Sequence, residues 1–187
     1  MPVPRIDEAM PLVAAVLVWG LAGAPAAPPP SCAARPKEKD FLASLVGEWE
    51  VEAEFRAGEG WESRPARASI RPDLGGCIVV ERYDGTRWGE PFAFLAILGA
   101  NGGGADAANP IQEVFVHSQH GILSLSSGRI EDGELIVEDA PTVEGKVVLI
   151  RHVYFDVSPR GFRYESRRST DRGASWSVSW KARYRRR

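Results

Sequence analysis

Hydrophobic and polar residues alternate in the stretch GEWEVEAEF, where Trp49, Val51, Ala53 and Phe55 are separated by glutamates. A period of two places the apolar side chains on one face of a β-strand and the glutamates on the other. Similar runs follow, and they read ARASIR, CIVVERY, FAFLAIL, EVFVHS, ILSLSS, ELIVED, KVVLIRHVYFDV, FRYESRRS and WSVSWKARY. About ten short strands predict an all-β fold, either an antiparallel up-and-down barrel or a sandwich.

A short helix is predicted before the first strand. In DFLASLVGEW, Asp40 is suited to cap a helix, Phe41, Leu42 and Leu45 follow at helical spacing, and Gly47 ends the pattern. The preceding residues 27–39 are rich in proline and alanine and lack an apolar period, which predicts an extended linker. The barrel domain is therefore expected to span residues 40–187.

The first 26 residues have the features of a secretory signal. A short apolar run from Met10 is followed by Ala24-Pro25-Ala26, which fits the small-residue rule for cleavage. The run is shorter than the roughly 20 residues that span a bilayer comfortably. We expect a signal peptide at 1–26 and an exported protein, periplasmic or secreted, without an integral membrane domain; a membrane anchor and a buried helix are the alternatives.

Several connections share two turn-favouring residues followed by glycine, as in Glu131-Asp132-Gly133, Pro159-Arg160-Gly161 and Asp171-Arg172-Gly173. A three-residue hairpin loop needs its third residue in the left-handed region, which glycine enters without a steric penalty. In STDRGASW, Asp171 is expected to accept backbone N–H groups and Gly173 to take the left-handed position. This motif is interpreted as a turn.

These loops also predict a strand register. The expected pairs are Arg168 with Trp176, Ser166 with Val178, Tyr164 with Trp180, Tyr154 with Ser166, and His152 with Arg168. Aromatic residues of the last hairpin meet aromatic or aliphatic residues in this register, which indicates a shared inward face.

Pairing of the first and last strands would close the sheet into a barrel. If Trp49 faces Arg186, then Phe55 faces Trp180, and all four side chains have the inward parity. Closure would remove the exposed strand edges that invite aggregation. The register therefore favours an up-and-down barrel.

The segment Gly47-Glu48-Trp49, directly after a short helix, resembles the Gly-x-Trp that opens the first strand of lipocalins and related calycins. In that superfamily an arginine of the last strand covers the tryptophan, and Arg186 is the matching residue. Together with DLGGCIVVERYDG, STDRGASW and ARYRR, the pattern also resembles an exported bacterial family of unknown function. The resemblance implies a calycin-like barrel, similar to lipocalins and fatty-acid-binding proteins, and no particular activity.

Charge and cysteine content narrow the choice of partners. The formal net charge of the 187 residues is −2, so nothing favours nucleic acid, whose binders usually concentrate basic residues on one face. The only cysteines are Cys32 and Cys77, which give no disulfide framework, although they could pair after export.

Candidate chemistry is sparse. His117 and His120 are three residues apart and would face opposite sides of a strand, so they do not predict a metal site. Cys77 and the serines at 118, 124 and 126 lack any nucleophile motif. No catalytic or metal-binding residue is predicted.

The enclosed aromatic side chains suggest a ligand cavity, because small barrels either fill with side chains or hold one ligand. We expect a small hydrophobic or amphipathic ligand, with Arg168 pairing a carboxylate or phosphate. The predicted ligand-binding residues are His152, Tyr154, Tyr164, Ser166, Arg168, Trp176 and Trp180, and the predicted structural residues are Trp49, Asp171, Gly173 and Arg186.

Two alternatives remain open. A resemblance to haem-binding barrels of the nitrobindin type would make His152 an axial haem ligand, although no other cofactor is predicted. The barrel could instead be solid and act as a structural or interaction module. The glycine-rich segment at 99–110 is interpreted as a surface loop or as a lid over the cavity.

Overall fold

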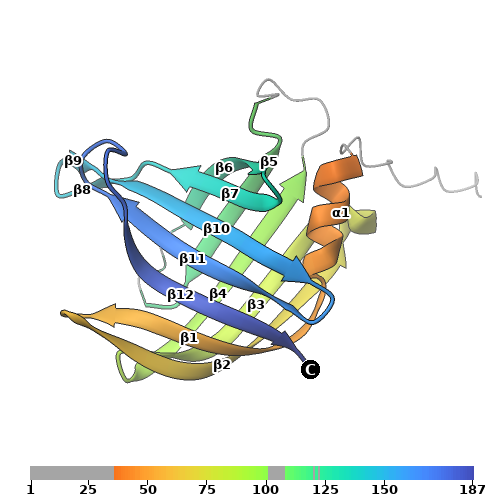
Figure 1. Ribbon diagram of the computed structural model, residues 1–187, viewed down its shortest axis with the longest axis horizontal. Helices are drawn as coiled ribbons and strands as arrows, with labels where there is room; N and C mark the ends of the chain where they lie inside the picture. Colours follow the sequence, from red (N-terminus) through yellow and green to blue (C-terminus); the bar gives the residue numbers. More distant parts are fainter. Residues whose placement is uncertain (1–35, 101–107, 120, 122) are drawn as a thin grey trace, which may run out of the picture.

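The computed structural model describes residues 36–100, 108–119, 121 and 123–187, which form a closed antiparallel barrel with a helix at one end (Figure 1). The all-β barrel predicted from the sequence is confirmed. The barrel elements are α1 (Pro36–Leu45), β1 (Gly47–Ala57), β2 (Gly60–Asp73), β3 (Ile78–Arg87), β4 (Glu90–Ala100), β5 (Ile111–His117), β6 (Leu123–Glu131), β7 (Glu134–Asp139), β10 (Leu149–Ser158), β11 (Gly161–Ser169) and β12 (Ser177–Arg186).

Ten strands follow one another around the barrel, and β12 closes it against β1. The closing register pairs Trp49 with Arg186 and Phe55 with Trp180, as the sequence predicted. A single-turn helix, η1 (Leu74–Gly76), joins β2 to β3, and the small hairpin of β8 (Thr142–Val143) and β9 (Lys146–Val147) lies between β7 and β10. Closure pairs the backbone groups of both terminal strands.

The helix begins at Pro36, four residues before the expected cap at Asp40, so part of the predicted linker is helical. Proline suits a first helical position because its missing N–H would have no intrahelical partner there. The predicted signal peptide at 1–26 and the linker up to residue 35 lie outside the described residues, as do residues 101–107 of the proposed lid. No helix in the described ranges is long and apolar enough to cross a membrane.

The register of the two C-terminal hairpins differs from the prediction. Tyr154 pairs with Tyr164 and His152 with Ser166, two residues away from the predicted partners. One residue of this shift arises because Ser158 pairs with Gly161 across a two-residue turn, and the other because of a bulge between Phe155 and Ser158. A shift of two keeps every side chain on its predicted face, since strand side chains alternate with a period of two. The prediction that His152 and Tyr154 face inward is therefore correct, although the predicted register is wrong.

The loop between β11 and β12 is longer than predicted and spans residues 170–176. The Asp171 carboxylate accepts hydrogen bonds from Ser169 Oγ at 2.7 Å and from the Ser175 backbone N–H at 2.9 Å. The Ser175 hydroxyl also donates to this carboxylate, and its hydrogen bond, followed by the two others, lowers the pKa of Asp171 to about 2. Gly173 has a φ of 91°, in the left-handed region. A bulge between Ser166 and Arg167 then brings Ser166 opposite Trp180 instead of Val178.

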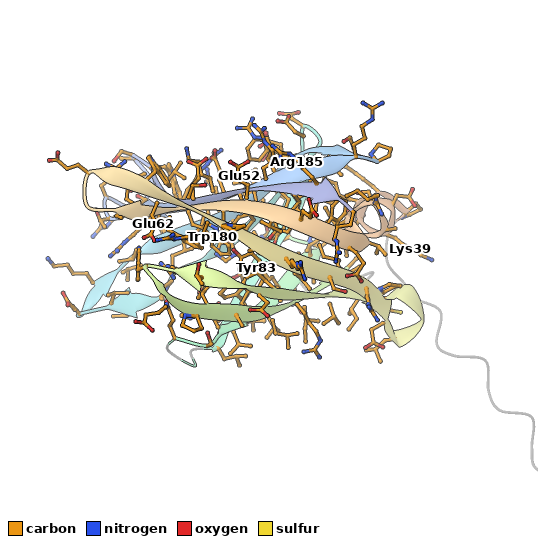
Figure 2. The ribbon with its side chains drawn as sticks, turned by 90° about the horizontal axis from the view of Figure 1, so that it is seen from below. Lys39, Glu52, Glu62, Tyr83, Trp180 and Arg185 are labelled. Atoms are coloured by element: carbon orange, nitrogen blue, oxygen red, sulfur yellow. The ribbon has the colours of Figure 1, made fainter. Side chains whose placement is uncertain are left out.

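Side chains divide between a buried interior and a charged outer surface. Tyr83 and Trp180 lie within the barrel, whereas Glu52 and Arg185 lie on its outside (Figure 2). Cys77, which precedes β3, is disulfide-bonded, and the other cysteine of the chain lies outside the described residues.

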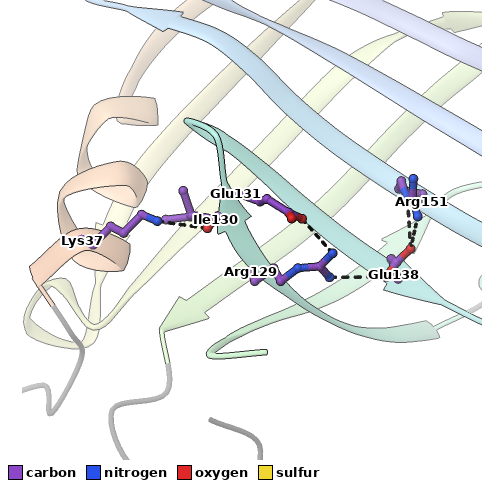
Figure 3. A network of polar contacts seen from close by, with 6 residues as sticks. All are labelled: Lys37, Arg129, Ile130, Glu131, Glu138 and Arg151. Carbon is purple, nitrogen blue, oxygen red and sulfur yellow. Dashed lines mark hydrogen bonds and ion pairs between the residues drawn. The ribbon is translucent and has the colours of Figure 1, made fainter. Parts of the chain in front are cut away.

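Ion pairs join neighbouring strands on the outer surface (Figure 3). Glu138 of β7 accepts a hydrogen bond from Arg151 of β10 at 2.7 Å and lies 3.8 Å from Arg129 of β6. Arg129 also pairs with Glu131 at 2.8 Å, and Lys37 of α1 donates to the Ile130 carbonyl at 3.0 Å. Exposed pairs of this kind contribute about 0–1 kcal/mol each. Their main effect is to keep the surface polar.

Candidate functional site

A cavity of about 370 Å³ lies at the barrel end opposite α1. Helix α1 leads into the start of β1, which pairs with the end of β12, whereas the cavity is lined from the other ends of these strands. Side chains from most strands of the barrel line it, among them Arg87, Phe92, Phe115, His117, Ser124, Ser126, Asp139, Pro141, Val148, Ile150, His152, Tyr164, Ser166, Arg168 and Trp180.

Five of the seven predicted ligand-binding residues line this cavity. They come from three adjacent strands, β10, β11 and β12, whose inward positions alternate with outward ones. The five are His152, Tyr164, Ser166, Arg168 and Trp180. The other two, Tyr154 and Trp176, lie elsewhere.

Trp176 was predicted to face the interior but lies on the outer surface. Its ring is 4.1 Å from the guanidinium carbon of Arg151, which is an outward residue of β10. A three-residue loop would have placed Trp176 in β12 with its side chain facing inward. The observed loop spans residues 170–176, so Trp176 lies in the loop and not in the strand. Trp176 is therefore not a cavity residue.

Tyr154 lies below the cavity, in a buried polar cluster. Its hydroxyl donates to Oε1 of Glu113 at 2.9 Å, and His152 Nδ1 donates to Oε2 of the same carboxylate at 2.7 Å. The Glu113 side chain is fully buried. Burial opposes a charge on His152, but the negative charge and hydrogen bond of Glu113, helped by Asp139, outweigh it and raise the pKa of the imidazole.

A second carboxylic acid is buried in the interior, on β3. Glu81 is 1% exposed and accepts a hydrogen bond from the Tyr184 hydroxyl at 2.8 Å. Burial raises the pKa of Glu81 to about 8, with a further contribution from the charge of Glu113. The carboxyl of Glu81 is therefore mostly protonated at neutral pH.

Neither buried acid was predicted from the sequence. Glu81 lies between Val79 and Tyr83, and Glu113 lies two residues after Ile111. In each strand the acid shares the parity of its apolar neighbours, which is the signal that could have revealed it.

Arg87, at the end of β3, is a cavity residue that the sequence analysis also missed. Its guanidinium carbon lies 5.3 Å from the ring centroids of Phe55 and Phe92 and 4.0 Å from that of Trp88. Burial lowers the pKa of this guanidinium. Within the described ranges, no carboxylate forms an ion pair with Arg87. Arg87 is six residues after Glu81 on the same strand, so the alternation of side chains along β3 places both on the inward face.

Trp180 is the largest aromatic residue of the cavity. Its ring stacks on Phe55 at 5.3 Å and meets Tyr164 edge-on at 4.8 Å. The indole Nε1 of Trp180 is buried and has no hydrogen-bond partner in the described part of the chain, and the same holds for Nε of Arg87. Among the described residues, Arg87 and Trp180 therefore each bring a donor without an acceptor to the cavity lining, as does the buried hydroxyl of Ser126.

Arg168, which the sequence predicted as the anion-binding residue, is exposed at the cavity rim. The apolar residues Pro141, Val148 and Ile150 form the neighbouring part of the wall, where Ile150 of β10 pairs with Arg168 of β11. The cavity lining carries two guanidinium groups, the partly buried Arg87 and the exposed Arg168, and one carboxylate, that of Asp139.

The residues weighed for metal binding or nucleophilic chemistry are scattered. His117 lines the cavity, whereas His120 lies outside the described residues. Ser124 donates to the Phe115 carbonyl at 3.5 Å, and Ser118 accepts from the Ala93 backbone. The described ranges contain no group of three side chains able to hold a metal ion.

Comparison with known proteins supports the fold. No protein-family model and no curated protein matches the chain. Among solved structures, the S-type phycobiliprotein lyase CPES from Guillardia theta is similar, with a TM-score of 0.52 and 12% sequence identity over 80% of this chain and 92% of that chain. The topology and this likeness define a calycin-like β-barrel protein. At 12% identity, the likeness shows a common fold alone.

Proposed function

We propose that this barrel binds a small hydrophobic or amphipathic molecule in the cavity at its open end. The observation that carries the proposal is a cavity of about 370 Å³ with aromatic and aliphatic walls and buried, unpaired donors from Arg87 and Trp180. Small-molecule sites are typically 300–1,000 Å³, mostly apolar, with a few polar groups. This cavity falls near the lower end of that range and suits a compact ligand.

The distribution of side chains supports binding over a solid barrel. Near α1 the interior is filled, because Trp49 packs against Phe162 and Tyr184 with ring centroids 5.1 and 6.5 Å away. Toward the other end, the side chains of β10 and β11 surround the cavity instead of filling it. The structural neighbour is named as a phycobiliprotein lyase, but the proposal relies on the cavity itself.

The proposal includes export. The predicted signal at 1–26 would place the barrel in the periplasm or outside the cell. Intact-mass measurement of the protein purified from its host should show a chain that starts at Ala27. A mature protein that retains Met1 would contradict export by cleavage.

Binding is tested with N-phenyl-1-naphthylamine, a neutral fluorescent probe of apolar cavities. The unmodified barrel should bind it with increased fluorescence, and Ile150→Trp should abolish binding because the added ring fills the cavity. Leu125→Trp is the matched control, since Leu125 is 65% exposed on the outside of β6. Equal probe binding by both variants, or no binding by the parent protein, would contradict a ligand cavity and favour a structural module.

A haem-binding barrel is the second candidate, because one observation favours it. The His152 imidazole lines the cavity, and its Nδ1 is bonded to Glu113. Carboxylates commonly orient ligating histidines in this way. Titration with haemin should then produce a Soret band that shifts in His152→Gln and stays unchanged in His117→Gln. A spectrum that is the same in all three proteins would exclude His152 as the ligand.

A further inference from the structure

The inner end of the cavity carries a cation and a neutral donor that lack acceptors. Nε of Arg87 and Nε1 of Trp180 are both buried without partners in the described residues, and the Trp180 residue is only 6% exposed. A buried donor that loses its water and gains no acceptor is destabilising, and more so when it is charged. The aromatic rings around Arg87 contact the guanidinium but provide no oxygen atom for its N–H groups.

The acids of the interior and of the cavity lining bond to other groups, and within the described ranges none of them forms an ion pair with Arg87. Glu113 accepts from Tyr154 and His152, and Glu81 accepts from Tyr184. Asp139, which lines the cavity from β7, accepts from the Ala140 backbone at 2.7 Å. The described chain therefore leaves Arg87 without a carboxylate, so the inner cavity has the charge that complements an anion.

The positions of the strands indicate how an amphipathic ligand would lie. In the ten-strand ring, β3 and β10 are five strands apart and so face each other across the barrel. Arg87 belongs to β3, whereas the apolar residues Val148 and Ile150 lie on or just before β10. A head group at Arg87 would direct an apolar tail toward the wall formed by Val148 and Ile150.

We infer, building on the proposed function, that the cavity selects amphipathic carboxylates and that Arg87 and Trp180, not the rim residue Arg168, bind the carboxylate. One guanidinium and one neutral indole N–H match a single negative charge with two acceptor oxygens. A phosphate dianion carries more charge than this pair compensates. The ligand class is therefore a monoanion with a short apolar tail.

The test compares decanoate with decanol as competitors of bound N-phenyl-1-naphthylamine at pH 7.5. The unmodified protein should prefer decanoate by at least tenfold, and decyl phosphate should compete less well than decanoate. In Arg87→Met the preference should disappear while the neutral probe still binds, and Arg87→Lys should keep part of it. Trp180→Phe should reduce the preference severalfold. Arg168→Met is the matched control and should keep the full preference.

The outcomes separate the two proposals. Equal competition by decanoate and decanol, or a preference that is lost in Arg168→Met and kept in Arg87→Met, would overturn the carboxylate site while the ligand cavity stands. No binding of probe or decanoate by the unmodified protein would overturn both. Circular dichroism of each variant verifies that the barrel is folded, and the neutral probe verifies that the cavity is intact.

Discussion

The two ends of the barrel each hold an arginine and a tryptophan, but their hydrogen bonding differs. At the end covered by α1, the guanidinium carbon of Arg186 lies 4.5 Å from the Trp49 ring. Arg186 donates to the Pro159 carbonyl at 2.8 Å and to the Val46 carbonyl at 3.1 Å. The Trp49 indole donates to the Leu45 carbonyl at 3.0 Å. Each of these donors has a backbone acceptor.

At the open end, Arg87 Nε and Trp180 Nε1 have no acceptor in the described chain. The difference comes in part from α1, because the last carbonyl groups of a helix have no intrahelical partner and here that of Leu45 accepts from Trp49. The Val46 carbonyl directly after the helix and the Pro159 carbonyl in the turn after β10 accept from Arg186. A cation at a helix C-terminus is also favourable for the helix dipole. Residue type and burial alone do not distinguish a structural pair from a ligand-binding pair, whereas hydrogen-bond pairing does.

Removal of the tryptophan at the closed end should have the largest effect. Trp49 is 0% exposed and contacts Phe162, Tyr184 and Arg186. Trp49→Ala should lower the free energy of unfolding by about 3–5 kcal/mol, measured by urea denaturation. The control Trp61→Ala, at a 37% exposed position, should lose less than about 1 kcal/mol. Similar losses at both sites would show that the closed end is not a packed core.

The buried acid Glu81 should make stability depend on pH. Its folded pKa of about 8 is above the usual 4.5, so its stabilising contribution is complete below pH 4.5 and is lost as the pH rises to about 8. The raised pKa of His152 acts in the same direction. Glu81→Gln should flatten the decline and increase stability at pH 8 by a few kcal/mol.

Urea midpoints between pH 5 and 8 provide the measurement for this prediction. Glu52→Gln, on the outer surface, is the control and should keep the parent profile. A parent protein whose stability increases over this pH range would refute a protonated Glu81.

The two arginines should respond in opposite ways to the same substitution. Arg186→Met leaves the Val46 and Pro159 carbonyls without their donor and should lower the free energy of unfolding by about 1–2 kcal/mol. Arg87→Met removes a half-buried, unpaired charge but keeps an apolar side chain against Phe92, so stability should be unchanged or higher. Both variants are measured by thermal and urea unfolding. Equal destabilisation would show that the two arginines do not differ in their hydrogen bonding as described.

A small loss of stability is expected when Trp176 is replaced. Its stacking with Arg151 is on the outer surface, where such a contact contributes about 0.5–1 kcal/mol. Trp176→Ala should therefore lower stability by that amount and leave binding of N-phenyl-1-naphthylamine unchanged. A loss of probe binding would indicate that Trp176 lines the cavity.

Periodicity and parity explain why the fold was predictable. Alternation in the first strand, the repeated hairpin turns and the matched parity of the first and last strands predicted a closed barrel, and the pairing of Trp49 with Arg186 is confirmed. The hairpin registers were wrong because side chains such as Asp171 hold a wider loop and bulges shift the strands. Errors of two residues preserved the faces, so most inward assignments are correct despite the wrong register.

The sequence by itself determined which side chains face inward, because alternation along a strand is a local property of the backbone. Only the tertiary structure decided which inward residues meet. Arg87 and Trp180 come from strands that are 93 residues apart in the chain and lie at one cavity, and Glu113 meets His152 across 39 residues. Whether a buried donor finds an acceptor depends on such distant contacts, which the local pattern of hydrophobic and polar residues does not encode.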